Sequence, residues 1–253
     1  MAVEIDRKRW SEGRVREVYR WTDKLYSLRV DAEVQPFTAG QFTKLGMVIG
    51  DELVSRPYSY VNAPDETPLE FYFITVPDGP LTNRMVALMP GDPVEVMSRP
   101  SGFLTLDEVP DAAHLWMLST GTAIGPFLSI LKSGRPWQRF EHVVLVHAVR
   151  LAAELSFSET IQTLSRTYPE RFTYVPVVSR ETTDFALQAR VPALIEDGRL
   201  EDRVGLPIDV VRSQVMICGN PDMVKATSAT LLTRGLTRNR RREPGYVTVE
   251  NYW

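Results

Sequence analysis

The sequence has a single cysteine, Cys218, among its 253 residues. One thiol cannot form an internal disulfide, and it cannot supply the several thiolates that hold an iron–sulfur cluster. The three histidines, His114, His142 and His147, lack the spacing of metal ligands, and neither H-E-x-x-H nor C-x-x-C occurs. The sequence therefore predicts a metal-free protein of a reducing compartment.

Long apolar runs are also missing, since no stretch reaches the length needed to cross a bilayer. The first residues lack the apolar region of a signal peptide, so we expect a cytoplasmic protein that does not bind membranes. A net charge of −3 argues against nucleic acid as a partner. With 43% hydrophobic and 24% charged residues, the chain has the composition of a globular protein large enough for two domains.

The texture of the chain changes near residue 110. Before it, short alternating apolar segments separated by Pro and Gly turns predict the strands of an antiparallel barrel. These segments are 14–19, 24–30, 41–45, 56–62, 69–76 and 93–97. After it, continuous apolar strands alternate with helical patterns, which predicts a parallel sheet with helices on both faces. The strands are 115–118, 142–147, 172–178 and 214–218, and the helices are 127–131, 159–167 and 222–234. We therefore predict two domains, an N-terminal antiparallel Greek-key β-barrel (1–105) and a C-terminal α/β Rossmann-like parallel sheet (106–253).

Residues 56–62 combine a fixed cation with phenol rings on one expected strand. Alternation places Arg56, Tyr58 and Tyr60 on one face. Ser59 points to the other face, and Pro57 favours an edge strand because proline cannot donate to a ladder. A guanidinium beside aromatic rings suits a flat ligand that carries a phosphate. An ordinary aromatic strand with a surface ion pair is the alternative, and this segment alone favours it.

A short helix is expected over 82–89, directly after Asp78-Gly79-Pro80. Its first turn would offer free backbone N–H groups and a positive dipole end to a phosphate. A helix that only closes the end of the barrel explains the pattern equally well.

Ligands of open parallel sheets bind at the carboxyl ends of the strands. There, Thr120-Gly121-Thr122 forms a glycine turn into a helix, which suits a pyrophosphate, although Ala123 breaks the G-x-G-x-x-G pattern. Arg150 and Arg180 each directly follow a strand, and Arg190 comes shortly after. Converging guanidiniums would select a ribose 2′-phosphate and hence NADP, whereas any one of them could be a solvated surface arginine.

The C-terminal region has two unusual features. Four arginines crowd one segment, namely Arg238, Arg240, Arg241 and Arg242. The chain then ends in Tyr252-Trp253, and aromatic residues at an end suggest docking onto a flat apolar surface, with packing into a groove as the alternative.

Five motifs, in this order and spacing, make the sequence resemble the ferredoxin–NADP reductase family over essentially the whole chain. The likeness is greatest to the bacterial ferredoxin/flavodoxin–NADP reductases that end in an aromatic pair. The motifs are R-P-Y-S at 56–59, G-T-A-I-G-P at 121–126, V-V-S-R at 177–180, C-G-N-P-D-M at 218–223 and the terminal Tyr252-Trp253. Ala123 and Gly125 depart from the family's more usual Gly and Ala.

The resemblance implies FAD on the barrel. Arg56 would contact the pyrophosphate, Tyr58 would stack on the isoalloxazine ring, and Ser59 would lie near flavin N5. Trp253 would cover the other flavin face and move aside for the nicotinamide. The residues implied to bind FAD are Arg56, Pro57, Tyr58, Ser59, Pro80, Leu81, Thr82, Thr122, Tyr252 and Trp253.

The resemblance also implies NADP(H) on the α/β domain, with Cys218 beside the nicotinamide. The residues implied to bind NADP(H) are Arg150, Ser179, Arg180, Arg190, Gly219, Asn220 and Asp222. Ser59, Cys218 and Trp253 are the implied catalytic residues, with positioning roles. Glu250 matches an acidic residue near the family's C-terminus, and its role stays open.

The implied function is electron transfer between NADP(H) and ferredoxin or flavodoxin by hydride transfer at flavin N5. The carrier would dock near Arg238–Arg242, unless that segment is simply a solvated basic loop, and we expect a monomer. One alternative is the flavin reductase component of an oxygenase or ferric-siderophore system. Another, from a different class, is a nucleotide-binding module without turnover.

Overall fold

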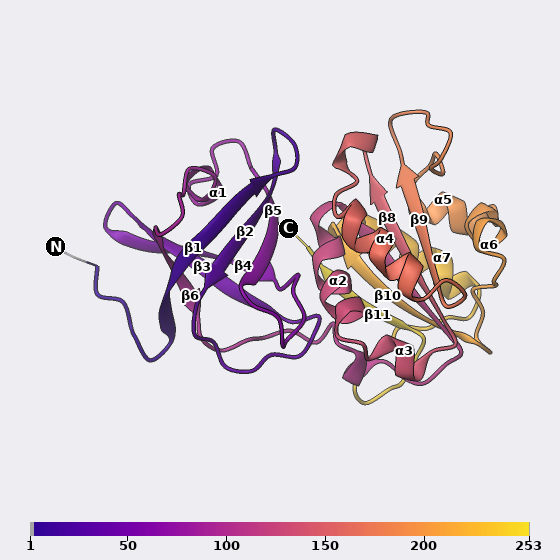
Figure 1. Cartoon of the computed structure of the whole chain (residues 1–253). Helices are drawn as coiled ribbons and strands as arrows, with labels where there is room; N and C mark the ends of the chain where they lie inside the picture. Colours follow the sequence, from indigo (N-terminus) through magenta and orange to yellow (C-terminus); the bar gives the residue numbers. More distant parts are fainter. Residues whose placement is uncertain (1–2, 253) are drawn as a thin grey trace. The chain divides into compact units, whose positions relative to one another are not determined.

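The structure is a computed structural model that describes residues 3–252 and divides into two compact units (Figure 1). The first contains the residues up to Thr105 together with Leu128–Ser133. The second contains Leu106–Phe127 and the residues from Gly134 onward. One helix, α2 (Ile124–Lys132), therefore contributes residues to both units.

The first unit is a six-stranded antiparallel sheet. Its strands are β1 (Trp10–Arg20), β2 (Leu25–Asp31), β3 (Phe42–Ile49), β4 (Glu52–Ser59), β5 (Leu69–Ile74) and β6 (Pro93–Met97). They pair in the order β4-β3-β6-β1-β2-β5, and an isolated bridge joins Tyr60, directly after β4, to Phe71 of β5. Strand β6 returns to lie beside β3 after the β3-β4-β5 run, which is the Greek-key connection. The predicted antiparallel Greek-key barrel is confirmed.

Alternation along the strands fills the interior of this unit. Leu28 and Val30 of β2 lie opposite Phe71 and Leu69 of β5 in one buried cluster. Tyr60 is fully buried in the same cluster, where its ring stacks on Phe37 with centroids 3.9 Å apart. Tyr60, directly after β4, thus holds the end of this strand to the core.

Two predicted elements of this unit have different bounds in the structure. The strand expected over 56–62 begins earlier and ends earlier, because β4 pairs with β3 from Glu52 to Ser59. The helix expected over 82–89 is shorter, since α1 covers only Thr82–Met85. After Met85 the hydrogen bonds tighten to the i→i+3 type, and the Asp92 carboxylate accepts the Met89 N–H at 2.7 Å, which ends the helix.

The second unit is a five-stranded sheet, and all its pairs are parallel. Its strands are β7 (His114–Thr120), β8 (His142–Val149), β9 (Phe172–Val178), β10 (Ser213–Gly219) and β11 (Val247–Asn251). The order is β11-β10-β7-β8-β9, so the chain leaves the central β7 toward β8 and later crosses to β10 on its other side. The predicted Rossmann-like parallel sheet is confirmed.

Helices lie on both faces of this sheet (Figure 1). They are η1 (Leu106–Glu108), η2 (Gly121–Ala123), α2, α3 (Pro136–Arg139), η3 (Ala152–Glu154), α4 (Ser158–Thr167), α5 (Val191–Glu196), α6 (Arg199–Val204) and α7 (Pro221–Thr233). Leu194, Leu200 and Leu231 of α5, α6 and α7 pack with Val144 and Val146 of β8 in one cluster. Helices α3 and α4 contact β8 and β9. Within residues 3–252, no helix has both the length and the apolar character needed to cross a membrane.

Strand β11 and helices α3, α5 and α6 were not predicted from the sequence. Strand β11 carries Val247 and Val249 opposite Val215 and Ile217 of β10. Pro244-Gly245 supplies a turn signal shortly before it, but the alternation covers only five residues, too few to mark a strand without its neighbour. The missed helices span four to six residues, too short for a helical period to show.

Candidate cofactor sites

The predicted flavin residues of β4 lie at the edge of the first sheet. Register places Tyr58 opposite Thr43 and Arg56 opposite Leu45, so the two side chains share a face, as expected. The Arg56 guanidinium is exposed, forms no ion pair within residues 3–252, and donates only to the Ser55 carbonyl at 2.7 Å. Burial raises the pKa of Tyr58 to about 12, while the nearby Arg56 acts in the opposite sense. A neutral phenol beside a free guanidinium is thus presented on this edge.

The other residues of this motif have different environments. Pro57 is exposed on the outermost strand, where its missing N–H breaks no ladder. Ser59 is the last residue of β4 and is buried opposite Phe42, on the other face from Tyr58. The Tyr58 ring meets Phe73 edge-on, with centroids 6.1 Å apart.

The turn into α1 carries the predicted pyrophosphate residues. Leu81 is buried in the same cluster against which Tyr58 packs, and the Thr82 hydroxyl accepts the Val76 N–H at 3.3 Å. Within the described chain, the backbone N–H groups of Leu81 and Thr82 have no hydrogen-bond partner, and Pro80 has no N–H to offer. Gly79 has no room for a side chain, because a Cβ there would lie 2.8 Å from the Thr82 Oγ1. The turn therefore presents two unused donors.

The glycine turn of the second unit begins at the carboxyl end of β7. Gly121 has a φ of +55°, and the space where a Cβ would point is open. Thr122 lies within η2, which leads directly into α2. On the neighbouring strand, Gly219 packs against Thr120, so the two strand ends meet where the strand order reverses. This is the topological switch point at which such sheets bind nucleotides.

Three predicted arginines gather at the carboxyl ends of β8 and β9. The Arg180 N–H donates to the Arg150 carbonyl at 2.9 Å, and Ser179 donates twice to the Val149 carbonyl. Leu187 returns beside Val178, which brings Arg190 back to the same sheet edge at the start of α5. All three arginines are exposed, and none forms an ion pair within residues 3–252. Their uncompensated charge suits an anion.

Cys218 and Glu250 are direct register partners in β10 and β11. Burial, together with the charge of Glu250, raises the pKa of the Cys218 thiol well above its usual value, so the thiol is protonated. Burial also raises the pKa of Glu250 to about 7. The Tyr252 N–H donates to the Gly219 carbonyl at 2.6 Å, which holds the end of the described chain against β10. Trp253 lies outside the described residues.

Helix α7 begins at the end of β10 with the predicted residues Asn220 and Asp222. Asn220 is the N-cap, and its Oδ1 accepts the Met223 N–H at 2.9 Å. Asp222 is exposed in the first turn. Asn220 thus has a capping task of its own, which leaves its amide N–H groups for a ligand.

The structure contains a buried histidine for which no role was predicted from the sequence. His147 is fully buried on β8 between Ser119 and Pro176 of the neighbouring strands. Burial lowers its pKa to about 4, with the Gly121 backbone partly opposing the effect. A neutral imidazole therefore lies beside the nucleotide turn. A lone histidine in an apolar strand gives no signal of this in the sequence.

The four C-terminal arginines are exposed, but half of them have acidic partners. Arg241 donates to the Glu108 carboxylate at 2.8 Å, and Arg240 lies 3.4 Å from Glu243. Arg238 and Arg242 have no ion pair within residues 3–252. The segment therefore carries less uncompensated charge than its sequence suggests.

A cavity of about 650 Å³ lies between α4 and β9. Tyr174, Pro176 and Phe185 line it together with Ile161 and Arg166. None of the predicted site residues belongs to its lining. Among the described residues, no cluster of His, Cys, Asp and Glu could hold a metal ion.

An antiparallel barrel with an arginine–tyrosine edge and a parallel sheet with a glycine turn at its switch point are together typical of a nucleotide-binding protein. Comparison with known proteins agrees. A family model described as the oxidoreductase NAD-binding domain matches residues 117–229. The flavodoxin/ferredoxin–NADP reductase of Shigella flexneri is 55% identical over 245 residues, covering 96% of this chain and 99% of the relative. That of Escherichia coli K12 is 54% identical over 245 residues, with the same coverage.

A solved structure is similar over nearly the whole chain. It is a ferredoxin NADP⁺ reductase from Neisseria gonorrhoeae with bound FAD and NADP, 34% identical, with a TM-score of 0.92. The match covers 97% of this chain and 99% of the other. This chain belongs to the flavodoxin/ferredoxin–NADP reductase family.

Proposed function

We propose that this protein is an FAD-dependent oxidoreductase that moves electrons between NADP(H) and a one-electron carrier protein, ferredoxin or flavodoxin. The first unit would bind FAD and the second NADP(H), with the domain boundary at residues 105–106. The observation that carries this proposal is that two groups of arginines have no acidic partner within residues 3–252. Arg56 lies beside Tyr58 on β4, and Arg150, Arg180 and Arg190 lie at the sheet edge where β8 and β9 end.

The residues of the first unit fit FAD. The free guanidinium of Arg56 and the unused N–H groups of Leu81 and Thr82 are suitable donors for a pyrophosphate, with Pro80 shaping the turn. Tyr58, with a pKa raised to about 12, stays neutral and offers a flat face to the flavin ring. Ser59 would position the reactive edge of the flavin, and Pro57 keeps Arg56 extended. Thr122, Tyr252 and Trp253 are the remaining residues proposed to contact FAD.

The residues of the second unit fit NADP(H). Arg150, Arg180 and Arg190 would hold the 2′-phosphate, with Ser179 beside them. The open space above Gly121 and the close-packed Gly219 leave room for the rest of the nucleotide at the switch point. Asn220 and Asp222 would contact it at the start of α7.

Bound FAD would supply the chemistry, which is acceptance of a hydride from NADPH at N5 and single-electron exchange with the carrier. The protein's task is to orient the two rings and to exclude water. Cys218 would position the nicotinamide as a neutral thiol, because its raised pKa rules out a thiolate nucleophile at neutral pH. Trp253 would cover the exposed flavin face and give way to the nicotinamide.

For the carrier, the exposed segment 238–242 is the proposed docking surface. Its attraction for an acidic partner would rest mainly on Arg238 and Arg242, since Arg240 and Arg241 have acidic neighbours. Reduction of flavodoxin and of ferredoxin at increasing salt tests this surface. A rate that does not fall with salt would remove it. We also propose that the protein is cytoplasmic and monomeric.

The flavin seat is tested by FAD binding to the apoprotein of the wild type, Arg56→Ala and Tyr58→Ala. We expect each variant to bind FAD about 10-fold or more weakly, because each loses a charged hydrogen bond or a ring contact. Tyr19→Ala removes an exposed tyrosine of β1 and is the matched control. A wild-type protein that takes up no FAD would instead favour a nucleotide-binding module without turnover.

A further inference from the structure

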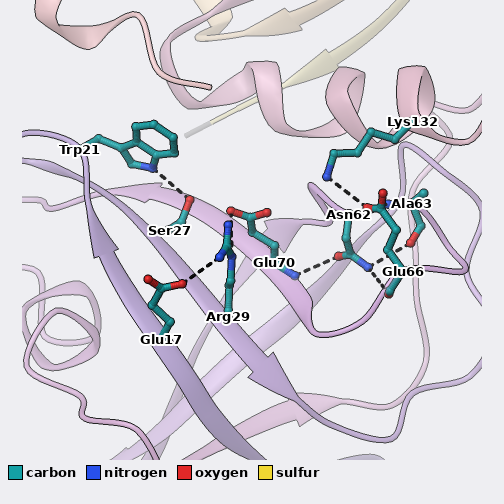
Figure 2. Close-up of polar contacts among 9 residues, drawn as sticks. All are labelled: Glu17, Trp21, Ser27, Arg29, Asn62, Ala63, Glu66, Glu70 and Lys132. Carbon is teal, nitrogen blue, oxygen red and sulfur yellow. Dashed lines mark hydrogen bonds and ion pairs between the residues drawn. The ribbon is translucent and has the colours of Figure 1, made fainter. Parts of the chain in front are cut away.

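Asn62 lies three residues beyond the end of β4 and is almost fully buried, with 3% of its surface exposed. Its side chain uses all its hydrogen-bonding groups. Oδ1 accepts the Glu70 N–H at 2.9 Å, and Nδ2 donates to the carbonyls of Ala63 and Glu66 at 3.0 and 2.9 Å (Figure 2). The Asn62 side-chain amide thus links the segment after β4 (the flavin strand, which carries the predicted FAD residues) to β5 and to the turn at 63–66.

The backbone of Asn62 has a partner on α2. The Ser129 hydroxyl, which is fully buried, donates to the Asn62 carbonyl at 2.7 Å. One turn further along the same helix face, Lys132 pairs with the Glu66 carboxylate at 3.1 Å (Figure 2). The same carboxylate also accepts the Ala63 N–H at 2.9 Å. Helix α2 therefore holds this turn by two polar contacts.

Helix α2 begins directly after η2, which contains Gly121 and Thr122 of the nucleotide turn. A straight helix rises about 1.5 Å per residue, so Ser129 lies only about 8 Å along the axis from the start of α2 at Ile124. Asn62, in turn, is three residues from Ser59. The first part of α2 thus links the Asn62–Ser129 contact to the proposed NADP(H) site, and three residues of chain link it to the proposed FAD site.

We infer that the Asn62–Ser129 hydrogen bond is a positioning contact for the transfer of reducing equivalents, holding the nucleotide-turn helix to the flavin strand. The inference rests on the proposed function. Both residues are buried and bonded within the protein, so they would act through the strand and the helix. A buried hydroxyl–carbonyl bond suits this task because its geometry is narrow and water does not compete for it.

The test uses the FAD-loaded full chain with Ser129→Ala, which removes only the hydroxyl, and Ser129→Thr, which keeps it. Flavin reduction by NADPH is followed anaerobically under rapid mixing. For Ser129→Ala we expect the rate constant at saturating NADPH to fall about 10-fold or more, because small misplacements of reacting groups are costly. The Kd values for FAD and NADPH should change less than about 2-fold, and Ser129→Thr should recover most of the rate.

Ser165→Ala is the matched control, since the Ser165 hydroxyl donates to the Ile161 carbonyl within its own helix, α4. It should leave the rate unchanged. Amide hydrogen exchange gives a readout that is independent of turnover. The Glu70 amide, which donates to the Asn62 side chain, should exchange faster in Ser129→Ala than in Ser165→Ala.

A wild-type rate in Ser129→Ala overturns the inference, whether or not the Glu70 amide exchanges faster. A parallel rise in the Kd for FAD also overturns it, since the contact would then only support the flavin seat. A wild-type protein whose bound flavin NADPH does not reduce overturns the proposed function itself. That result is recognised from the wild type alone, before any variant is compared.

Discussion

Gly219 at the end of β10 lies so close to Thr120 of β7 that no side chain fits between them. A Cβ at Gly219 would lie 2.2 Å from the Thr120 Oγ1 and 2.4 Å from the Met223 Cε. The Met223 methyl can move, but Thr120 is held at the end of a central strand. The ends of β7 and β10 are therefore in direct contact at the switch point, and the conformation of the nucleotide turn depends on this contact.

Gly219→Ala should weaken NADPH binding about 10-fold or more and lower the free energy of unfolding by about 1–3 kcal/mol, because the new methyl displaces Thr120. Thr120→Ala, which removes the clashing oxygen, should restore much of the loss when combined with Gly219→Ala. The two effects should thus be non-additive in a double-mutant cycle of urea unfolding. Additive losses would show that the two residues do not clash.

Arg180→Ala should raise the KM for NADPH about 10- to 100-fold and leave the KM for NADH nearly unchanged. The reason is that a hydrogen bond to a charged group contributes about 1.5–3 kcal/mol, and NADH lacks the 2′-phosphate. Dye reduction with both nucleotides measures this. Arg166→Ala, which removes an exposed guanidinium of α4, is the control. An unchanged preference for NADPH would remove Arg180 from the phosphate site.

Glu250→Gln should become increasingly more stable than the wild type as the pH rises from about 4.5 to about 7. Burial raises the pKa of Glu250 from 4.5 to about 7 in the folded chain. Between these values the folded protein holds a proton that the unfolded chain has released, so rising pH costs stability, and the loss is complete above about pH 7. Urea unfolding at pH 5 and pH 8 measures the difference between the two proteins. Parallel pH profiles would contradict the assignment.

His147→Leu should make the protein less sensitive to acid. Burial lowers the pKa of His147 from 6.5 to about 4, so the unfolded chain takes up a proton between these values while the folded chain does not. The wild type should therefore be fully stabilised above about pH 6.5 and should lose this contribution on acidification toward pH 4. His142→Gln is the comparison, because burial also lowers the pKa of the half-buried His142 while its hydrogen bond to the Glu170 carbonyl opposes the effect, so we expect a smaller change. An equal change in both variants would refute the prediction.

The fold could largely be predicted because it follows from local patterns. Alternation at 24–30 and 69–76 placed residues such as Leu28 and Phe71 in one core, and continuous apolar runs at 142–147 and 172–178 marked buried parallel strands. Strand β11 was missed because its pairing with β10 is a tertiary contact, which a five-residue segment does not predict by itself. Helix α1 is shorter than the predicted 82–89 because Asp92, which lies outside the helix, accepts the Met89 N–H.

The site was only partly predictable for the same reason. Motifs name Arg56, Tyr58, Arg150 and Arg180, and strand ends gather them at sheet edges. What they cannot show is how neighbours tune them. The pKa of Glu250 is raised by burial, which exists only in the folded chain, and Glu108, the acidic partner of Arg241, lies 133 positions away. Asn62 lies within the predicted flavin segment 56–62, but its hydrogen bonds form only when Glu70 and Ser129 pack against it in the folded chain.

The most direct test of the proposed function is an anaerobic titration of the purified protein with NADPH, followed by its optical spectrum. We predict a yellow protein whose flavin absorbance is bleached by about one equivalent of NADPH, since one hydride carries both electrons. NADH at the same concentration should bleach it far more slowly. A colourless protein that takes up no FAD, or a yellow one that NADPH leaves oxidised, would contradict it.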